Sequence, residues 1–270
     1  MTPTTLRRDT VTLMGIELDR VTETQAVARI VGALDAGRGG WLVTPNLDHL
    51  RLASEHSSLR SLIAGADLAV ADGMPLVWAS RLLGDPLPER VPGSGLIWDL
   101  CEDAGKNGRS VLLVGGAGAA GARAAAVICD RYSGLSECRH LPLPMNFRPE
   151  EPGMVEPVLE AVAASGADLV FVGLGFPKQE RLIAALRPAL PGAWFAGVGI
   201  SLSFVAGEVR RAPPWVQTLG LEWGHRLVQE PRRLATRYLR HGIPFAVRLF
   251  RHVMRRRLAS RGDQDPRSPA

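Results

Sequence analysis

Ser110-Val-Leu-Leu-Val-Gly-Gly-Ala-Gly-Ala-Ala-Gly121 is the stretch that decides the fold class of this 270-residue chain. Ser110–Val114 has the pattern of a strand. A glycine-rich turn follows, and an alanine-rich helical stretch runs from Ala119 to Cys129. Short apolar strands that alternate with helices are typical of a parallel sheet covered on both faces. The stretch therefore predicts one strand–helix step of an α/β domain.

The same alternation extends to both sides of this step. Further strand patterns lie at Val11–Leu18, Trp41–Thr44, Leu68–Ala71, Asp168–Val172 and Trp194–Val198, with a poor one at Ser133–His140. Helical patterns lie at Ala26–Leu34 after the capping box Thr22–Gln25, at Leu50–Ile63 as one or two helices, and at Pro75–Leu83, Glu150–Ala164 and Pro177–Leu186. We expect a Rossmann-like parallel sheet with helices on both faces over residues 1–212.

The pattern changes after Gly207. Trp215–Tyr238 is mainly helical in pattern, and Phe245–Leu258 predicts a helix with one apolar and one arginine-rich face. Residues 231–262 contain ten arginines and no Asp or Glu. A basic amphipathic helix is typical of binding to an anionic membrane surface. A helix docked on the core or on a second copy, with solvated arginines, is the alternative. We expect a helical appendage at 213–259 and a disordered tail at 260–270.

Composition excludes several classes of protein. Hydrophobic residues make up 46% of the chain and charged residues 22%, which is ordinary for a globular protein. The three cysteines form no C-x-x-C pair, so we expect neither a disulfide framework nor a zinc site. No stretch reaches the ~18–20 apolar residues of a membrane span, and no signal peptide is evident. We expect a cytoplasmic protein, peripheral on the inner face of the plasma membrane.

Polar residues and glycines directly follow the predicted strands. They are Thr44 and Asn46, Asp72, Gly115 and Gly116, and Gly173 and Gly175. Ligands of open α/β sheets bind beyond the carboxyl ends of the strands. Asp72 is either a general base or part of an Asp-Gly turn that caps the next helix. Asn46 either hydrogen-bonds a sugar or caps a helix.

Two further segments could bind an anion. Lys178 and Gln179 open a helix, where backbone N–H groups and a lysine can hold a phosphate, although a charged first turn is also ordinary. Arg90, beside a Gly93-Ser-Gly95 turn in a Pro/Gly-rich connection, either clamps a phosphate or is solvated. No His, Cys or carboxylate cluster has metal-ligand spacing, and no D-x-D is present. We therefore expect no metal and no cofactor, with arginines neutralising any leaving diphosphate.

The glycines from Gly116 to Gly121 fit the dinucleotide-binding pattern G-x-G-x-x-G. That pattern also needs an acidic residue about 20 residues further on, and Glu137 is near that distance. An NAD(P)-dependent oxidoreductase is therefore one alternative. A UDP diphosphate would use the same glycine turn without the acidic residue, and a simple tight turn is the third interpretation.

Five segments, taken together and in order, resemble the WecG/TagA/CpsF glycosyltransferase family over about Val11 to Tyr238. They are Thr44-Pro-Asn46-Leu-Asp48 (T-x-N-x-D), Ala71-Asp72-Gly73 with Arg90-Val-Pro-Gly93 (A-D-G…R-x-x-G), Val172-Gly-Leu-Gly-Phe-Pro-Lys-Gln-Glu180 (V-G-L-G-x-P-K-Q-E), Gly197-Val-Gly199 through Arg211-Ala-Pro213 (G-V-G…A-G…R-A-P), and Gly220-Leu-Glu-Trp223 with Arg226-Leu227, Glu230-Pro231 and Arg233 (G-L-E-W…R-L…E-P-x-R).

The resemblance implies a metal-independent, inverting transfer of an N-acetylmannosamine-type sugar from a UDP donor to an undecaprenyl-diphosphate-linked acceptor. Asp72 would be the catalytic base, with Thr44 and Asn46 shaping the site. The implied substrate-binding residues are Asp48, Arg90, Gly115, Gly116, Gly173, Gly175, Lys178, Gln179, Arg226, Arg233 and Arg237. Arg237 lies one position beyond the place of a family arginine, at Thr236. The resemblance also implies that the C-terminal appendage completes the active site at the membrane.

Two departures from the family pattern could mark a different donor. Leu202-Ser203-Phe204 stands where the family often has F-D-F, and Met74-Pro75 stands where it often has a second glycine. A non-enzymatic membrane-binding module remains an alternative function. We expect no nucleic-acid partner, because few aromatic residues are interleaved with the arginines. A homo-oligomer remains open, with the surface near Trp215 and Trp223 as its expected interface.

Overall fold

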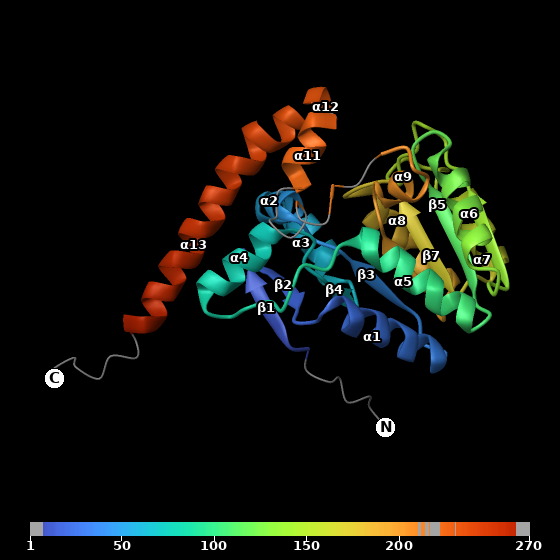
Figure 1. The fold of residues 1–270 in the computed structure, drawn as a ribbon, viewed down its shortest axis with the longest axis horizontal. Coiled ribbons are helices and arrows are strands. Elements are labelled where there is room, and N and C mark those ends of the chain that lie inside the picture. The colour runs from blue at the N-terminus through green and yellow to red at the C-terminus, as the bar shows by residue number, and fades with distance from the viewer. Residues whose placement is uncertain (1–7, 210–211, 214–215, 217–221, 230, 263–270) are drawn as a thin grey trace.

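A computed structural model describes residues 8–209, 212–213, 216, 222–229 and 231–262 of the chain. Figure 1 shows an α/β body with a long C-terminal helix along one side. No helix in the described ranges has the length and apolar character needed to cross a bilayer.

The centre of the body is a six-stranded parallel sheet, as expected. Its strands are β3 (Gly40–Val43), β4 (Leu68–Ala69), β5 (Ser110–Gly115), β6 (Glu137–Leu141), β7 (Leu169–Gly173) and β8 (Trp194–Gly197). They pair in the order β4-β3-β8-β7-β5-β6. Every residue of β3, β7 and β8 is buried. Burial on both faces explains why these strands are continuous apolar runs.

The two faces of the sheet carry two separate hydrophobic cores. Leu112 and Val114 of β5 belong to one core, and Val111 and Leu113 belong to the other, because successive side chains point to opposite faces. The first core includes α2 (Leu47–Glu55), α3 (Ser57–Ala64), α4 (Met74–Leu83), α7 (Glu156–Ser165) and α8 (Lys178–Leu186), which is followed by η1 (Arg187–Ala189). The second includes α1 (Glu23–Asp35), α5 (Gly93–Lys106), α6 (Ala120–Arg131) and α9 (Ser201–Val205).

The N-terminal segment is a hairpin rather than the single strand expected over Val11–Leu18. β1 (Thr10–Leu13) and β2 (Ile16–Asp19) are antiparallel. Met14 and Gly15 form the turn with φ of 51° and 80°, as two-residue hairpin turns require. The buried Asp19 carboxylate accepts a hydrogen bond from the Ala69 backbone N–H at 2.8 Å. The hairpin is thereby fixed to β4, the edge strand of the sheet.

Three other expectations need correction. The poor strand pattern at Ser133–His140 belongs to a real strand, β6, whose residues are at most partly buried at the sheet edge, so that an apolar sequence is not required. The turn expected at Gly93 is instead the start of the 14-residue helix α5. Helix α7 starts at Glu156 rather than Glu150. The capping box Thr22–Gln25 is confirmed.

The appendage consists of α11 (Glu222–Gln229), α12 (Pro231–Ala235), the π-helix η2 (Thr236–Gly242) and α13 (Ile243–Gly262). Phe245, Leu249 and Val253 of α13 are buried in the first core, and α13 packs mainly against α4. The helix is therefore docked on the body, while most of its arginines stay exposed. It continues past the expected start of the tail at residue 260; residues 263–270 lie outside the described part.

Candidate active site at the carboxyl edge of the sheet

The topology is of the kind that opens a crevice between two neighbouring central strands. After β3 the chain enters α2 in the first core, and after the adjacent β8 it enters α9 in the second core. Helices that leave neighbouring parallel strands toward opposite faces open a crevice at their carboxyl ends, and ligands bind there in open α/β folds. The region between the carboxyl ends of β3 and β8 is therefore the candidate ligand site.

Three segments meet at this crevice. A Cβ atom on Gly93, the first residue of α5, would lie 3.6 Å from Thr44 Oγ1 and 3.9 Å from Ser201 Oγ. Thr44 follows β3 and Ser201 begins α9, so two hydroxyls from neighbouring strand ends converge on one glycine. Both Thr44 and Ser201 are buried. Ser201 was not among the predicted site residues; its signal in the sequence is a hydroxyl shortly after the strand that ends in Gly197.

Asp72 is held in the same region by its backbone. Its N–H donates to the Pro45 carbonyl at 2.8 Å, and the Val91 N–H donates to the Ala71 carbonyl at 2.9 Å. These two bonds align the segments around residues 45, 72 and 91 next to one another. The Asp72 side chain is partly buried. The N-cap of α4 is Gly73, so Asp72 does not occupy the capping position that the alternative reading required.

Asn46 is the N-cap of α2, which confirms the capping interpretation. Its Oδ1 accepts from the N–H groups of Asp48 at 3.0 Å and His49 at 3.3 Å, while His49 Nδ1 accepts from the Asn46 N–H at 3.1 Å. The amide Nδ2 of Asn46 takes no part in this capping box. Asp48 forms an ion pair with Arg51 at 2.9 Å. Its carboxylate is therefore engaged on the first turn of α2.

Gln179 connects two loops at the crevice. Its Oε1 accepts from the N–H groups of Gly175 and Gly199, each at 3.0 Å. Gly175 follows β7 and Gly199 follows β8, so this one side-chain oxygen fixes the distance between the two strand ends. The Gln179 side chain is only 3% exposed. Its Nε2 donates to Glu180 Oε1 at 2.8 Å.

The carboxyl group of Glu180 lies in the interior of the protein. It is fully buried, and burial raises its pKa to about 7, although the hydrogen bond from Gln179 opposes this shift. Its Oε2 makes no hydrogen bond within the described part of the chain. Sequence reasoning placed Gln179 at the site but gave Glu180 no role, because its burial depends on the packing of α8 against the sheet.

Lys178 and Phe176 attach this loop to neighbouring segments. Lys178 Nζ donates to the Phe147 carbonyl at 3.0 Å. The Phe176 ring lies against the His49 ring, with centroids 4.3 Å apart. The start of α2 and the loop after β7 are therefore in direct contact, although more than 120 residues separate them in the sequence.

Arg90 joins the body to the appendage. Its Nη1 donates to Glu222 Oε2 at 2.5 Å, and the two side chains are 16% and 17% exposed. Glu222 begins α11, so this ion pair holds the first described helix of the appendage over the segment that carries Asp72 and Arg90. The side chains of Arg226, Arg233 and Arg237 lie outside the described part; their backbones belong to α11, α12 and η2.

The profile of the Glycosyl transferase WecG/TagA/CpsF family matches residues 11–259. The chain belongs to this family. It is therefore a glycosyltransferase of cell-wall polysaccharide synthesis, with a nucleotide-sugar donor and a lipid-linked acceptor. Family membership overturns the interpretation of the chain as a membrane-binding module without enzymatic activity. The resembling segments around Thr44, Asp72 and Gln179 lie at the strand ends described above, whereas residues 210–211, 220–221 and 230 of the last two segments lie outside the described part.

The position of Glu137 does not fit the ribose contact of an NAD(P) site. Glu137 is the first residue of β6 and pairs in register with Ser110, whereas the ribose contact requires the carboxyl end of that strand, four residues (~13 Å) further on. Glu137 instead forms an ion pair with Arg139. The ribose contact from Glu137, which the NAD(P) alternative predicted, is therefore wrong.

The glycine turn after β5 is also closely packed. Gly115 and Gly116 have φ of 78° and 99°, which favours glycine. Leu202 of α9 lies over the carboxyl ends of β7 and β5. A Cβ atom added to Gly173 would lie 2.6 Å from Leu202 Cδ1, and one added to Gly116 would lie 3.4 Å from the same atom. The glycine turn after β5 is thus packed against Leu202 of α9.

Proposed function

We propose that this glycosyltransferase transfers an N-acetylhexosamine of the N-acetylmannosamine type from a UDP-sugar to a polyprenyl-diphosphate-linked acceptor. The transfer inverts the anomeric centre, needs no metal, and takes place on the cytoplasmic face of the plasma membrane. The observation that carries the proposal is the convergence of the segments around Thr44, Asp72, Arg90 and Gln179 on one crevice. All of them are family segments, and the crevice lies where α/β folds bind ligands.

Asp72 acts as the general base. Its carboxylate takes the proton of the acceptor hydroxyl while that oxygen attacks the anomeric carbon, and the bond from this carbon to the UDP oxygen breaks. Attack from the side opposite the leaving group gives inversion. The short loop that carries Asp72 is fixed to Pro45 and Val91 by backbone hydrogen bonds. A fixed base within hydrogen-bond reach is what general base catalysis requires.

Basic groups neutralise the leaving UDP. Lys178 opens α8 at the same edge, and its ammonium group carries two N–H donors besides the one that the Phe147 carbonyl accepts. Arg226, Arg233 and Arg237 complete the set from the appendage. Charge that develops on a leaving diphosphate is stabilised most by donors that are already in position. The Arg90–Glu222 ion pair supports this arrangement, because it holds α11 over the site.

Helix α13 binds the membrane surface. Opposite its buried face it carries an exposed apolar stripe of Ile243, Val247, Met254 and Leu258, each about half exposed or more. Arginines border this stripe. Exposed apolar side chains next to cations are the pattern of a helix that lies in the interface of an anionic bilayer. Such a contact brings the carboxyl edge of the sheet to a lipid-linked acceptor.

The test is UDP release on vesicles that carry a polyprenyl-diphosphate-linked N-acetylglucosamine acceptor, with a panel of UDP-sugars. We expect acceptor-dependent release with one N-acetylhexosamine donor. Asp72→Asn should lower kcat by roughly 100-fold or more without changing UDP affinity or the melting temperature. Asp130→Asn is the matched control, because Asp130 is an exposed carboxylate on α6.

Two results would contradict the proposal. Wild-type activity in Asp72→Asn would remove Asp72 as the base. Absence of both UDP binding and UDP release with every donor would remove the nucleotide chemistry. A deletion of the appendage is a poor test, because it would also remove Phe245, Leu249 and Val253 from the core. Point variants of Arg226 and Arg233 are preferable, with an increase in the KM of the acceptor as the expected result.

A further inference from the structure

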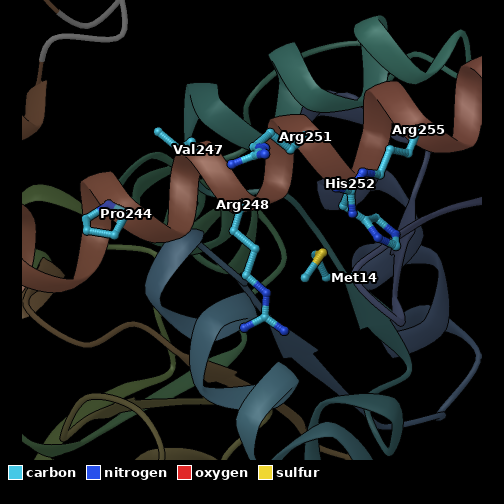
Figure 2. Close-up of a pocket in the computed structure, with 7 residues that line it drawn as sticks. All are labelled: Met14, Pro244, Val247, Arg248, Arg251, His252 and Arg255. Atoms are coloured by element: carbon cyan, nitrogen blue, oxygen red, sulfur yellow. The ribbon is translucent and has the colours of Figure 1, made fainter.

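A groove of about 440 Å³ lies between the β1–β2 turn and α13, away from the crevice of the candidate active site. Met14 lines it from the hairpin, and Arg248, Arg251, His252 and Arg255 line it from α13. Figure 2 shows Met14 opposite the helix, with the Arg248 side chain extending from α13 past it. Two parts of the chain more than 200 residues apart therefore form one basic groove.

The described part of the chain does not neutralise the arginines of this groove by ion pairs. Within the described part of the chain, Arg248, Arg251, His252 and Arg255 take part in no ion pair with a carboxylate. Most arginines of the body behave differently: Arg109, for example, is paired with both Asp35 and Asp103. Several uncompensated cations that share one concave surface create a positive potential that attracts an anion.

The same turn brings a further cation close. The Arg60 guanidinium would lie 3.6 Å from a Cβ atom on Gly15. By contrast, the arginine Arg257 on the next turn of α13 donates to the Leu82 carbonyl at 2.8 Å and so helps to dock the helix. On α13, Arg257 thus helps to dock the helix, whereas Arg248, Arg251 and Arg255 line the groove.

The surroundings of the groove indicate which anion it takes. Val247 lines the groove and also belongs to the exposed apolar stripe of α13, so a basic and an apolar surface share an edge. A ligand that fits both has a phosphate next to hydrocarbon. Among the described residues, no Phe, Tyr or Trp lines the groove to stack on a base, which disfavours a nucleotide. Arginines can hold phosphate oxygens through paired N–H donors.

We propose that the groove between the β1–β2 turn and α13 binds the phosphate head group of a single anionic phospholipid. The inference rests on the proposed function only in requiring that α13 meets a bilayer. It adds a defined head-group site, to which the hairpin contributes, and this site fixes the orientation of the enzyme on the membrane. The site is separate from the acceptor site at the carboxyl edge.

The experiment is vesicle co-sedimentation of the full chain at matched surface charge. The vesicles contain phosphatidylcholine with phosphatidic acid, phosphatidylserine or phosphatidylglycerol. We expect the tightest binding to phosphatidic acid, because its phosphomonoester exposes the most oxygens to arginine. The double variant Arg248→Gln/Arg251→Gln should lose this preference, with a roughly 10- to 30-fold loss of affinity for phosphatidic acid vesicles.

The matched control is Arg232→Gln/Arg240→Gln, which removes the same charge from exposed positions of α12 and η2. It should weaken binding to all anionic vesicles alike and keep the preference. Met14→Glu tests the hairpin: a carboxylate at Met14 should abolish the preference although α13 is unchanged. Circular dichroism and melting temperature check that each variant is folded.

Equal binding to the three lipids at matched charge, or equal losses of affinity in the two double variants, would overturn the site and leave only diffuse electrostatic attraction to the membrane.

A competition experiment distinguishes a lipid ligand from a free anion. Short-chain phosphatidic acid should displace the protein from vesicles, and displacement by inorganic phosphate at the same concentration would instead identify a free-phosphate site. UDP release from a detergent-solubilised acceptor reports on the proposed function alone, and we expect it to be unchanged in Arg248→Gln/Arg251→Gln.

Discussion

Replacing Glu180 by glutamine should make the free energy of unfolding much less dependent on pH between about 5 and 8. Glu180 is a fully buried residue of the first turn of α8, and one of its oxygens makes no hydrogen bond in the described part of the chain. Burial raises its pKa from the ordinary 4.5 to about 7. The folded protein therefore prefers the protonated carboxyl group.

The sign follows from proton linkage. Between pH 4.5 and 7 the folded state binds more protons at this site than the unfolded state, so the free energy of unfolding falls as the pH rises. Each pKa unit corresponds to ~1.4 kcal/mol, and the site therefore removes about 3 kcal/mol of stability across this window. Glutamine keeps the shape but does not titrate. Its extra N–H groups cost about 1–3 kcal/mol at every pH if they find no acceptor.

The measurement is urea unfolding at pH 5, 6, 7 and 8, followed by tryptophan fluorescence. The quantity to compare is the change in unfolding free energy between pH 5 and pH 8, because a constant cost of the glutamine cancels in this difference. Glu160→Gln, at an exposed carboxylate of α7, is the control and should retain the wild-type pH dependence. An equal loss of stability between pH 5 and pH 8 in Glu180→Gln and the wild type would show that Glu180 does not cause this pH dependence.

Two further predictions concern packing and thiol reactivity. Gly121→Ala should destabilise the protein by about 3 kcal/mol in urea unfolding, because the new Cβ would lie 2.2 Å from the Gly115 carbonyl oxygen. Gly32→Ala adds a methyl group at an exposed position of helix α1 with nothing within 4 Å, and it should stabilise the protein by about 0.5–1 kcal/mol. Equal effects of the two substitutions would contradict these expectations. Iodoacetamide should modify the exposed Cys129 of the folded protein well before Cys101, because burial raises the pKa of the Cys101 thiol. Mass spectrometry of the labelled peptides measures the order, and earlier labelling of Cys101 would contradict this prediction.

The local pattern was sufficient where an element is apolar on both faces or ends in a standard cap. Ser110–Val114 with its glycine turn, and the Thr22–Gln25 capping box, are present as predicted. The pattern was insufficient for β6, because an edge strand needs little apolar sequence. It was also insufficient for α5, whose opening Gly93-Ser-Gly95 looks like a turn when neighbours are unknown.

The candidate site was predictable only in part. The rule that ligands bind at strand ends identified Thr44, Asp72 and Gln179 individually, because each follows a strand or opens the next helix. Their mutual arrangement was not predictable. Arg90 forms an ion pair with Glu222, 132 residues away, and Gln179 bridges Gly175 to Gly199, which follows another strand.

The sequence by itself determined the class of fold, the ordered family segments and the basic amphipathic character of the last helix. These properties depend on hydrophobic period, turn residues and charge, all of which are local. Only the tertiary structure decided the strand order, the crevice between β3 and β8, the burial of Glu180 and the groove between Met14 and α13. These features depend on contacts between distant segments, whose free energy comes from burying both partners together, and no local pattern encodes which partner will be chosen.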